Sequence, residues 1–232
     1  MMKVTAIIPA AGSGTRMGTD RPKQLIELGG QPILAHTLQP FEACSSVEDV
    51  ILVVSKETFS FCSKHILPCF PKVDKVVFGG KKRQDSVFRG LEAVRTDTEI
   101  VVIHDGSRPF VTAEQIACSI DLCRKAGAVV TAVPVTDTVK YVANGVVERT
   151  LERSGLWLAQ TPQTFSFPLI WKAYQRAHKE GFYATDDSAL VERLGIKVAV
   201  LQGSYQNIKI TTPEDLAVAQ VILNQRNKRR ER

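Results

Sequence analysis

The sequence predicts a three-layer α/β fold with a doubly wound, mainly parallel sheet. Short apolar runs of strand length recur along the 232 residues, and segments with helical spacing lie between them. The apolar runs are continuous rather than alternating, which is typical of strands buried on both faces. A glycine-rich loop follows the first run, and ligands of such sheets bind beyond the carboxyl ends of the strands.

The apolar runs and the helical segments give the order of elements along the chain. Strands are expected at Val4–Pro9, Val50–Val54, Lys75–Phe78, Ile100–His104, Ala128–Val133 and Val198–Leu201. Helices are expected at Ile33–Phe41, Asp85–Val94 and Ala113–Ala126. A further helix is expected to begin at Pro213, because Thr212 can act as its N-cap and proline suits the first helical position.

Residues 136–155 depart from this pattern and predict a β-arm. Two segments of alternating, β-like character flank Asn144-Gly145, a dipeptide that is the strongest short-range signal for a hairpin. An isolated hairpin is only marginally stable unless it packs on something, and a second copy of the chain is the expected partner. The predicted architecture is therefore Rossmann-like, with a projecting β-arm that mediates dimerisation.

The charge distribution and the cysteine spacing argue against several classes of protein. The net charge is +6, but much of the excess lies in the final RNKRRER, and the rest is only mildly basic without interleaved aromatic residues. This pattern does not support nucleic-acid binding. The five cysteines include no CxxC pair and suit no zinc or disulfide framework, which favours a reducing cytoplasm. The apolar segment 4–11 is too short for a signal peptide or a membrane span.

The stretch IPAAGSGTRMGTDRPK, residues 8–23, can be compared with three kinds of phosphate-binding loop. A dinucleotide fingerprint, GxGxxG, requires a glycine at position 17, where the chain has Met17. A P-loop requires Gly-Lys followed by Ser or Thr, and this stretch lacks it. The remaining interpretation is a loop of the nucleotidyltransferase type.

The residues of this loop suit a polyphosphate. Gly12 and Gly14 allow backbone amides to approach phosphate oxygens closely. Arg16 and Lys23 are separated by a turn that Pro22 stiffens, and they can hold one phosphate group from two sides. The loop therefore predicts phosphate binding.

Three later stretches carry polar residues that can converge with this loop. Asp105 follows the strongest of the predicted strands, and one carboxylate together with nucleotide phosphates is the usual way to hold Mg²⁺. His104 beside it is expected to orient the loop rather than to transfer protons. Arg153 precedes the stretch LWLAQTPQ, and Lys209 lies just before the helix that begins at Pro213. Because these stretches follow strands, we expect them to reach one cleft.

Taken in order, the motifs resemble those of the 2-C-methyl-D-erythritol 4-phosphate cytidylyltransferases. They run from Val4 to about Leu223 and read PAAGSGTRM, RPK, GGKKRQDSV, HDGSRPF, VTDTVK, ERSGLWLAQTPQ, TDD and NIKITTPEDL. No single motif is decisive, but the complete set in this order is highly specific. The resemblance implies one nucleotidyltransferase domain over residues 1–232. It would transfer CMP from CTP to 2-C-methyl-D-erythritol 4-phosphate, releasing pyrophosphate, on the non-mevalonate route to isoprenoid precursors.

The resemblance also implies which residues form the site. CTP would be bound by Pro9, Ala10, Ala11, Gly12, Gly14, Gly80, Arg83, Ser86, Asp105 and Gly106. The Mg²⁺ ligand from the protein would be Asp105, and the catalytic residues would be Arg16, Lys23, Arg153 and Lys209. The chain departs from the family pattern at Lys81-Lys82, where relatives often carry acidic residues, and at Gln206, where some relatives carry one.

The same resemblance implies that the acceptor contacts two subunits. It places Thr138 and Arg153 of a neighbouring subunit's arm on the methylerythritol phosphate, so a homodimer is expected. Further candidates for the acceptor pocket are Arg108, Thr161, Thr185 and Asp186.

Two alternatives remain open from the sequence. The first is the same reaction on ribitol 5-phosphate, because the ribitol-5-phosphate cytidylyltransferases share most of these motifs. The second is a non-catalytic regulator that only binds a nucleotide. The presence together of Arg16, Lys23, Asp105 and Lys209 argues against a regulator, because binding alone does not require the full set.

Overall fold

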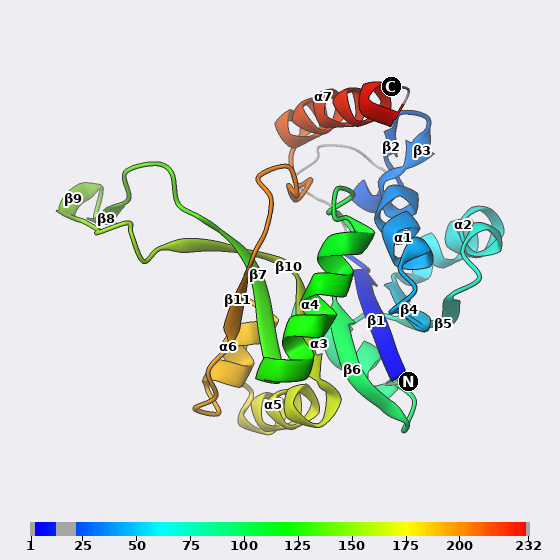
Figure 1. Ribbon diagram of the computed structural model, residues 1–232, viewed down its shortest axis with the longest axis horizontal. Helices are drawn as coiled ribbons and strands as arrows, with labels where there is room; N and C mark the ends of the chain where they lie inside the picture. Colours follow the sequence, from blue (N-terminus) through cyan, green and yellow to red (C-terminus); the bar gives the residue numbers. More distant parts are fainter. Residues whose placement is uncertain (1–2, 13–21, 231–232) are drawn as a thin grey trace.

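The computed structural model describes residues 3–12 and 22–230 and has a seven-stranded sheet at its centre. The strand order is β11-β7-β10-β6-β1-β4-β5. The strands are β1 (Lys3–Ala10), β4 (Asp49–Val54), β5 (Val73–Phe78), β6 (Thr98–Ile103), β7 (Ala128–Pro134), β10 (Trp157–Ser166) and β11 (Ala199–Gln202). Figure 1 shows this sheet between helices, with a thin arm extending from one side.

Most neighbouring strands run parallel, as predicted. β1 pairs in parallel with β4 and β6, β4 with β5, and β7 with β11. β10 is the exception, since it lies antiparallel between β6 and β7. Each run predicted as a strand lies in this sheet with ends that differ by no more than two residues; β6, expected to reach His104, ends at Ile103.

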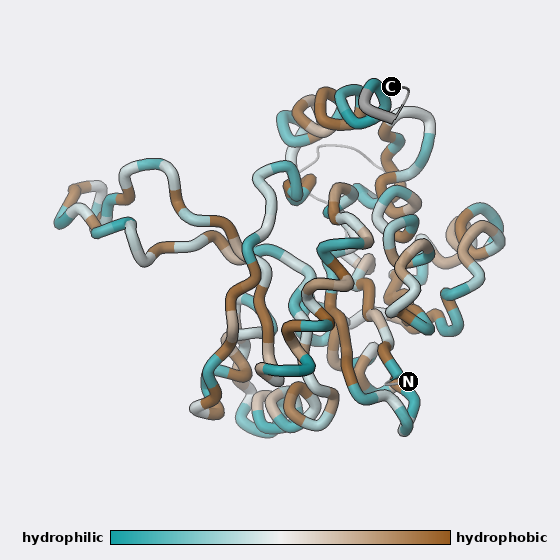
Figure 2. The backbone as a smooth tube through the Cα atoms, viewed as in Figure 1, coloured by the Kyte–Doolittle hydropathy of each residue, from teal (hydrophilic) through white to brown (hydrophobic). Residues whose placement is uncertain are grey.

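Helices cover both faces of the sheet and complete the three predicted layers. They are α1 (Ile33–Ala43), α2 (Lys56–His65), α3 (Arg83–Glu92), α4 (Ala113–Ala126), α5 (Phe167–Glu180), α6 (Asp187–Glu192) and α7 (Pro213–Arg230). Helices α1, α2 and α4 pack on one face, and α3, α5 and α6 on the other. In Figure 2 the apolar colouring follows the central strands between these layers. Among residues 3–12 and 22–230, no helix combines the length and apolar character needed to span a membrane.

Helix α4 shows how the local sequence determines where a helix begins and ends. Thr112 Oγ1 accepts from the Gln115 amide at 3.1 Å, and Gln115 Oε1 accepts from the Thr112 amide at 3.3 Å. Such a capping box stabilises a helix start by about 1 kcal/mol. Gly127 ends the helix with a φ of 76°, which a glycine adopts without strain. The observed bounds are those the sequence predicts.

Helix α7 packs over the short strands β2 (Glu27–Leu28) and β3 (Gln31–Pro32) through a separate apolar cluster. The cluster includes Leu28, Ile33 and Ile222. The helix begins at Pro213 as predicted, and the Asp215 amide donates to Thr212 Oγ1 at 3.4 Å. The segment that joins β11 to α7 lies above the sheet in Figure 1.

Residues 136–155 project from the sheet as the predicted hairpin (Figure 1). Its strands are β8 (Lys140–Ala143) and β9 (Val146–Thr150), which pair antiparallel. Asn144 and Gly145 have φ values of 51° and 79°, as a two-residue type I′ turn requires. The hairpin joins β7 to β10, so both of its ends leave from neighbouring strands of the sheet.

Candidate active site

A cleft of about 330 Å³ opens at the carboxyl ends of β1, β5 and β6. This is the edge at which the sequence predicts a ligand. Its lining comprises Pro9, Ala10, Ala11, Gly12, Lys23, Gln24, Gly80, Lys81, Lys82, Arg83, Ser86, Asp105, Gly106, Ser107 and Lys209. The lining brings together five separate stretches of the chain, and Asp105 is its one carboxylate among the described residues.

Glycines let the backbones that line the cleft approach one another. A Cβ on Gly106 would lie 2.9 Å from the Cβ of Ala10, and one on Gly79 would lie 2.3 Å from the Cβ of Ala11. The Gly80 amide donates to Ser86 Oγ at 3.1 Å, which ties this turn to the first turn of α3. Side chains at the two glycines would push these segments apart, so the glycines keep this part of the cleft closely packed.

Asp105 lies at the centre of a cluster of cations. Arg83 Nε donates to Asp105 Oδ1 at 2.7 Å, while Lys209 Nζ lies 2.8 Å and Arg108 Nε 3.5 Å from Oδ2. Burial opposes the charge on Asp105, but Arg83, Lys209 and Arg108 outweigh it and hold the pKa of this carboxyl well below its usual range. Asp105 is therefore an anion at neutral pH.

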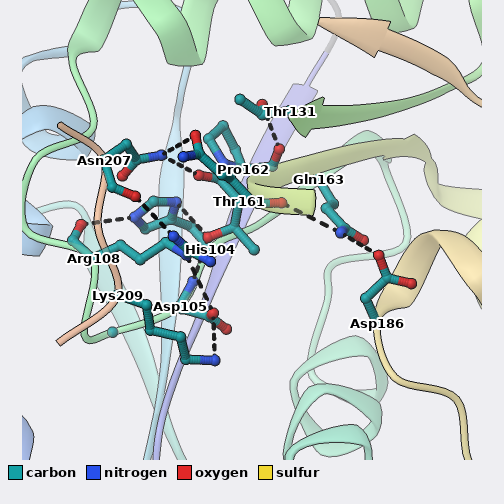
Figure 3. A network of polar contacts seen from close by, with 12 residues as sticks. His104, Asp105, Arg108, Thr131, Thr161, Pro162, Gln163, Asp186, Asn207 and Lys209 are labelled. Carbon is teal, nitrogen blue, oxygen red and sulfur yellow. Dashed lines mark hydrogen bonds and ion pairs between the residues drawn. The ribbon is translucent and has the colours of Figure 1, made fainter. Parts of the chain in front are cut away.

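A buried hydrogen-bond chain holds the backbone of Asp105 (Figure 3). The Asp105 amide donates to Thr161 Oγ1 at 3.0 Å, and that hydroxyl lies 3.0 Å from His104 Nδ1. His104 Nε2 lies 3.0 Å from the Arg108 carbonyl oxygen, which can only accept, so Nε2 carries the ring proton and Nδ1 accepts from Thr161. Burial lowers the pKa of His104 to about 4, which keeps the ring neutral.

The segment with Lys209 is tied to the same loop. Asn207 Nδ2 donates to the Thr161 carbonyl oxygen at 2.8 Å, and the Asn207 carbonyl oxygen accepts from Arg108 Nη1 at 2.7 Å. Figure 3 shows Asn207 and Lys209 on one segment, with the ammonium group of Lys209 at Asp105. Lys209 is thus positioned by contacts that its backbone neighbours make with β10 and the loop after β6.

Lys23 reaches the cleft from the end of the glycine-rich loop. Its Nζ lies 3.3 Å from the Ile210 carbonyl oxygen, next to Lys209 in the chain. Gln24 beside it is buried and donates through Nε2 to the Ala10 carbonyl oxygen. The other predicted residues of this loop, Gly14 and Arg16, lie outside the described residues.

Several predicted residues lie away from the cleft lining. Thr161 is 4% exposed and lies beneath Asp105, and Arg108 is largely buried behind the same carboxylate. Thr138 and Arg153 are exposed on the arm, where Arg153 donates to the Thr136 carbonyl oxygen. Contact of these residues with an acceptor stays a prediction.

The TDD motif places its three residues in three different environments. Thr185 is exposed, and Asp186 caps α6 by accepting from the Ala189 amide at 3.0 Å. Asp187 is fully buried and receives both terminal nitrogens of Arg83. The sequence did not predict a role for Asp187, because spacing alone does not distinguish it from Asp186.

Comparisons with known proteins agree with this geometry. The family model described as 2-C-methyl-D-erythritol 4-phosphate cytidylyltransferase matches residues 4–225. Proteins of that name from Desulforamulus reducens and Geotalea uraniireducens are 50% and 46% identical, over 98% and 99% of this chain and 98% and 100% of theirs. The crystal structure of a 4-diphosphocytidyl-2C-methyl-D-erythritol synthase from Anaerococcus prevotii superposes with a TM-score of 0.86 at 37% identity, covering 96% of both chains. The chain belongs to the 2-C-methyl-D-erythritol 4-phosphate cytidylyltransferase family.

Proposed function

We propose that the protein transfers CMP from CTP to 2-C-methyl-D-erythritol 4-phosphate, giving 4-diphosphocytidyl-2-C-methyl-D-erythritol and pyrophosphate. The observation that carries the proposal is the cleft, in which the described part of the glycine-rich loop meets Asp105, Lys23 and Lys209. Membership of the family supports both the nucleotide and the acceptor.

The reaction is a displacement at phosphorus. A phosphate oxygen of the acceptor attacks the α-phosphorus of CTP, and the bond from that phosphorus to the bridging oxygen breaks as pyrophosphate leaves. No general base is needed, since a phosphate monoester is largely ionised at pH 7. The difficulty is electrostatic, because one polyanion approaches another, and the protein acts by positioning and by neutralising charge.

The cations of the cleft suit that task. Lys23 Nζ lies 3.3 Å from the carbonyl oxygen of Ile210, the residue after Lys209, and both lysines line the cleft. A phosphate chain bound there would contact both. Each ammonium is a compact point charge that can follow charge as it moves from the attacking oxygen to the leaving group. Arg16, on the same loop as Lys23, is proposed to join them at the α-phosphate.

The donor set fits one Mg²⁺ ion that arrives with the nucleotide. Among the described residues, no three carboxylate, histidine or cysteine side chains form a metal cage. One carboxylate plus substrate phosphates is the mode that Mg²⁺ commonly uses, and Asp105 is the carboxylate present. When bound, the ion would neutralise charge on the phosphates. Lys209 would then turn from Asp105 towards the phosphates.

The arm is proposed to complete the acceptor site in a homodimer. It carries the exposed apolar side chains Tyr141, Val142, Val146 and Val147, which are 47–66% exposed. A solvent-exposed apolar hairpin is stabilised when a partner covers it, and a second copy of this chain supplies a matching arm. Thr138 and Arg153 would reach the partner's cleft in such a pair.

The proposal is tested by a paired assay of acceptors. Methylerythritol phosphate and ribitol 5-phosphate are each offered with Mg²⁺ and with each of the four nucleoside triphosphates, and pyrophosphate and the CDP-linked product are measured. We expect the fastest turnover with CTP and methylerythritol phosphate. Faster turnover on ribitol phosphate would change the acceptor, and the absence of pyrophosphate with either acceptor would favour a nucleotide-binding regulator.

A further inference from the structure

The guanidinium of Arg83 lines the cleft but donates to two carboxylates. Its Nη1 and Nη2 lie 3.0 and 2.8 Å from the two carboxylate oxygens of Asp187, which is a two-pronged pair. Its Nε lies 2.7 Å from Asp105 Oδ1. All three nitrogens of the guanidinium are therefore engaged by the protein's own anions.

The side chain of Asp187 is held in a fixed position, so it anchors the ion pair with Arg83. It is the first residue of α6, its side chain is 1% exposed, and Oδ1 also accepts from the hydroxyl of Tyr174. Tyr174 itself is buried within α5. The contacts link helices α5 and α6 to the first residue of α3, and through Arg83 to the loop after β6.

The arrangement makes the orientation of Asp105 depend on Asp187. Arg83 takes Oδ1 of Asp105, while Lys209 and Arg108 lie at Oδ2, so the carboxylate is held from both sides. Burial works against the charge on Arg83, but Asp187 and then Asp105 raise its pKa well above the usual range. The guanidinium is thus a fixed cation between two anions.

We propose that Asp187 is a positioning residue, which holds Arg83 on Asp105 and away from the phosphates of the nucleotide. This inference rests on the proposed function. The family resemblance assigned Arg83 to CTP, whereas its contacts here direct it to carboxylates. Asp187 acts on the reaction through Arg83 and has no contact with the cleft itself.

The charge on Asp187 determines where Arg83 is attracted. With Asp187 ionised, three cations face two carboxylates in this cluster. Without that charge, an entering triphosphate competes with Asp105 alone for the guanidinium. Arg83 would then bind the phosphates in the ground state and leave Oδ1 of Asp105 unheld. If Arg83 attracted the phosphates equally in the ground state and in the transition state, CTP would bind more tightly but the chemical step would not be faster.

The test compares Asp187→Asn with Glu192→Gln, a matched change from carboxylate to amide on the exposed side of the same helix. CTP affinity is measured by calorimetry without acceptor, kcat and KM by pyrophosphate release, and the folded fraction by circular dichroism. For Asp187→Asn we expect kcat per folded protein to fall at least tenfold while CTP affinity is unchanged or tighter. Glu192→Gln should match the parent in all three measurements.

A kcat within twofold of the parent would overturn the inference, as would weaker CTP binding that accounts for the whole loss. If Asp187→Asn does not fold, Tyr174→Phe is used instead, because it removes one hydrogen bond to Asp187 with little change in volume. A smaller fall in kcat is then expected, again with CTP affinity unchanged or tighter. No change in that variant would also overturn it. The unsubstituted protein distinguishes the failure of the proposed function from the failure of the inference about Asp187. If it releases no pyrophosphate, the proposed function is overturned, while the CTP affinities of the variants still test the role of Asp187.

Discussion

At the scale of single residues, the site is built on charges that hold one another in place. Asp105 is buried with three cations around it, and removing one partner from such a cluster is costly because a buried charge is left uncompensated. His104 and Thr161 fix the backbone beneath it. The backbone at Asp105 is therefore held in place by buried side chains.

Replacing Lys23 by alanine should reduce turnover by about 100-fold or more. The expected loss is that of one donor to charge that develops in the transition state. Steady-state pyrophosphate release checks it, with Lys64→Ala on the exposed face of α2 as the control. Turnover near that of the parent would remove Lys23 from the catalytic residues.

Stability should fall as the pH drops from 6.5 towards 4 because of His104. Its pKa is about 4 in the fold and 6.5 ordinarily, so the unfolded chain binds a proton in this window that the folded chain does not. The stability is fully present above pH 6.5, and about 3 kcal/mol is lost by pH 4. Urea unfolding at several pH values measures the slope, and His104→Gln should flatten it. If the free energy of unfolding depended on pH equally in the parent and in His104→Gln, His104 would not be the source of the pH dependence.

At the scale of elements, hydropathy predicted the buried parallel strands and missed β10. The middle of that strand buries Gln160, Thr161, Gln163 and Thr164, whose side chains form hydrogen bonds to other segments. A run of this kind is not apolar, so its burial follows from partners that only the fold supplies. Asp187 was missed for the same reason, since its partner Arg83 is 104 residues away. Caps and turns were predictable because their partners are three residues apart.

Helix α3 provides a test of packing against the sheet. A Cβ on Gly90 would lie 2.6 Å from Ile7 Cγ2 and 3.3 Å from Val53 Cγ2, although alanine favours a helix by about 1 kcal/mol. Overpacking of this kind costs about 1–3 kcal/mol. Because the gain in helix propensity offsets part of this cost, we expect Gly90→Ala to lower the free energy of unfolding by up to about 2 kcal/mol in urea titrations. Gly155→Ala, where a Cβ meets no atom within 4 Å, is the control. A more stable Gly90→Ala would show that α3 can shift away from the sheet.

At the scale of the whole molecule, the cleft and the arm lie in different parts of the chain. Lys23, Asp105 and Lys209 belong to the body, whereas Thr138 and Arg153 lie on the arm that projects from it (Figure 1). A site assembled from both parts within one subunit would require the arm to fold back. In a dimer with a shared site, the arm of each subunit would instead reach the cleft of the other subunit.

Mixing two inactive variants should restore activity if sites are shared. In a heterodimer of Lys23→Ala and Arg153→Ala, one site combines an intact body with an intact arm, and the other carries both defects. We expect each variant alone to be impaired and the co-refolded mixture to recover a substantial part of the parent's turnover. Sedimentation measures whether the mixture forms dimers. Activity no greater than the sum of the two variants would place Arg153 in its own subunit's site.

The carboxylate of Asp105 is also a counterion built into the protein. Its cations are already neutralised in part before any nucleotide arrives, so binding is an ion exchange rather than the filling of a bare positive pocket. A monovalent anion gains little by that exchange, because it would replace one charge by another of equal size. A triphosphate would carry enough charge to take Lys209 from Asp105 and to contact Lys23 as well. We therefore expect the cleft to prefer polyanions to the simple anions that surround it in solution.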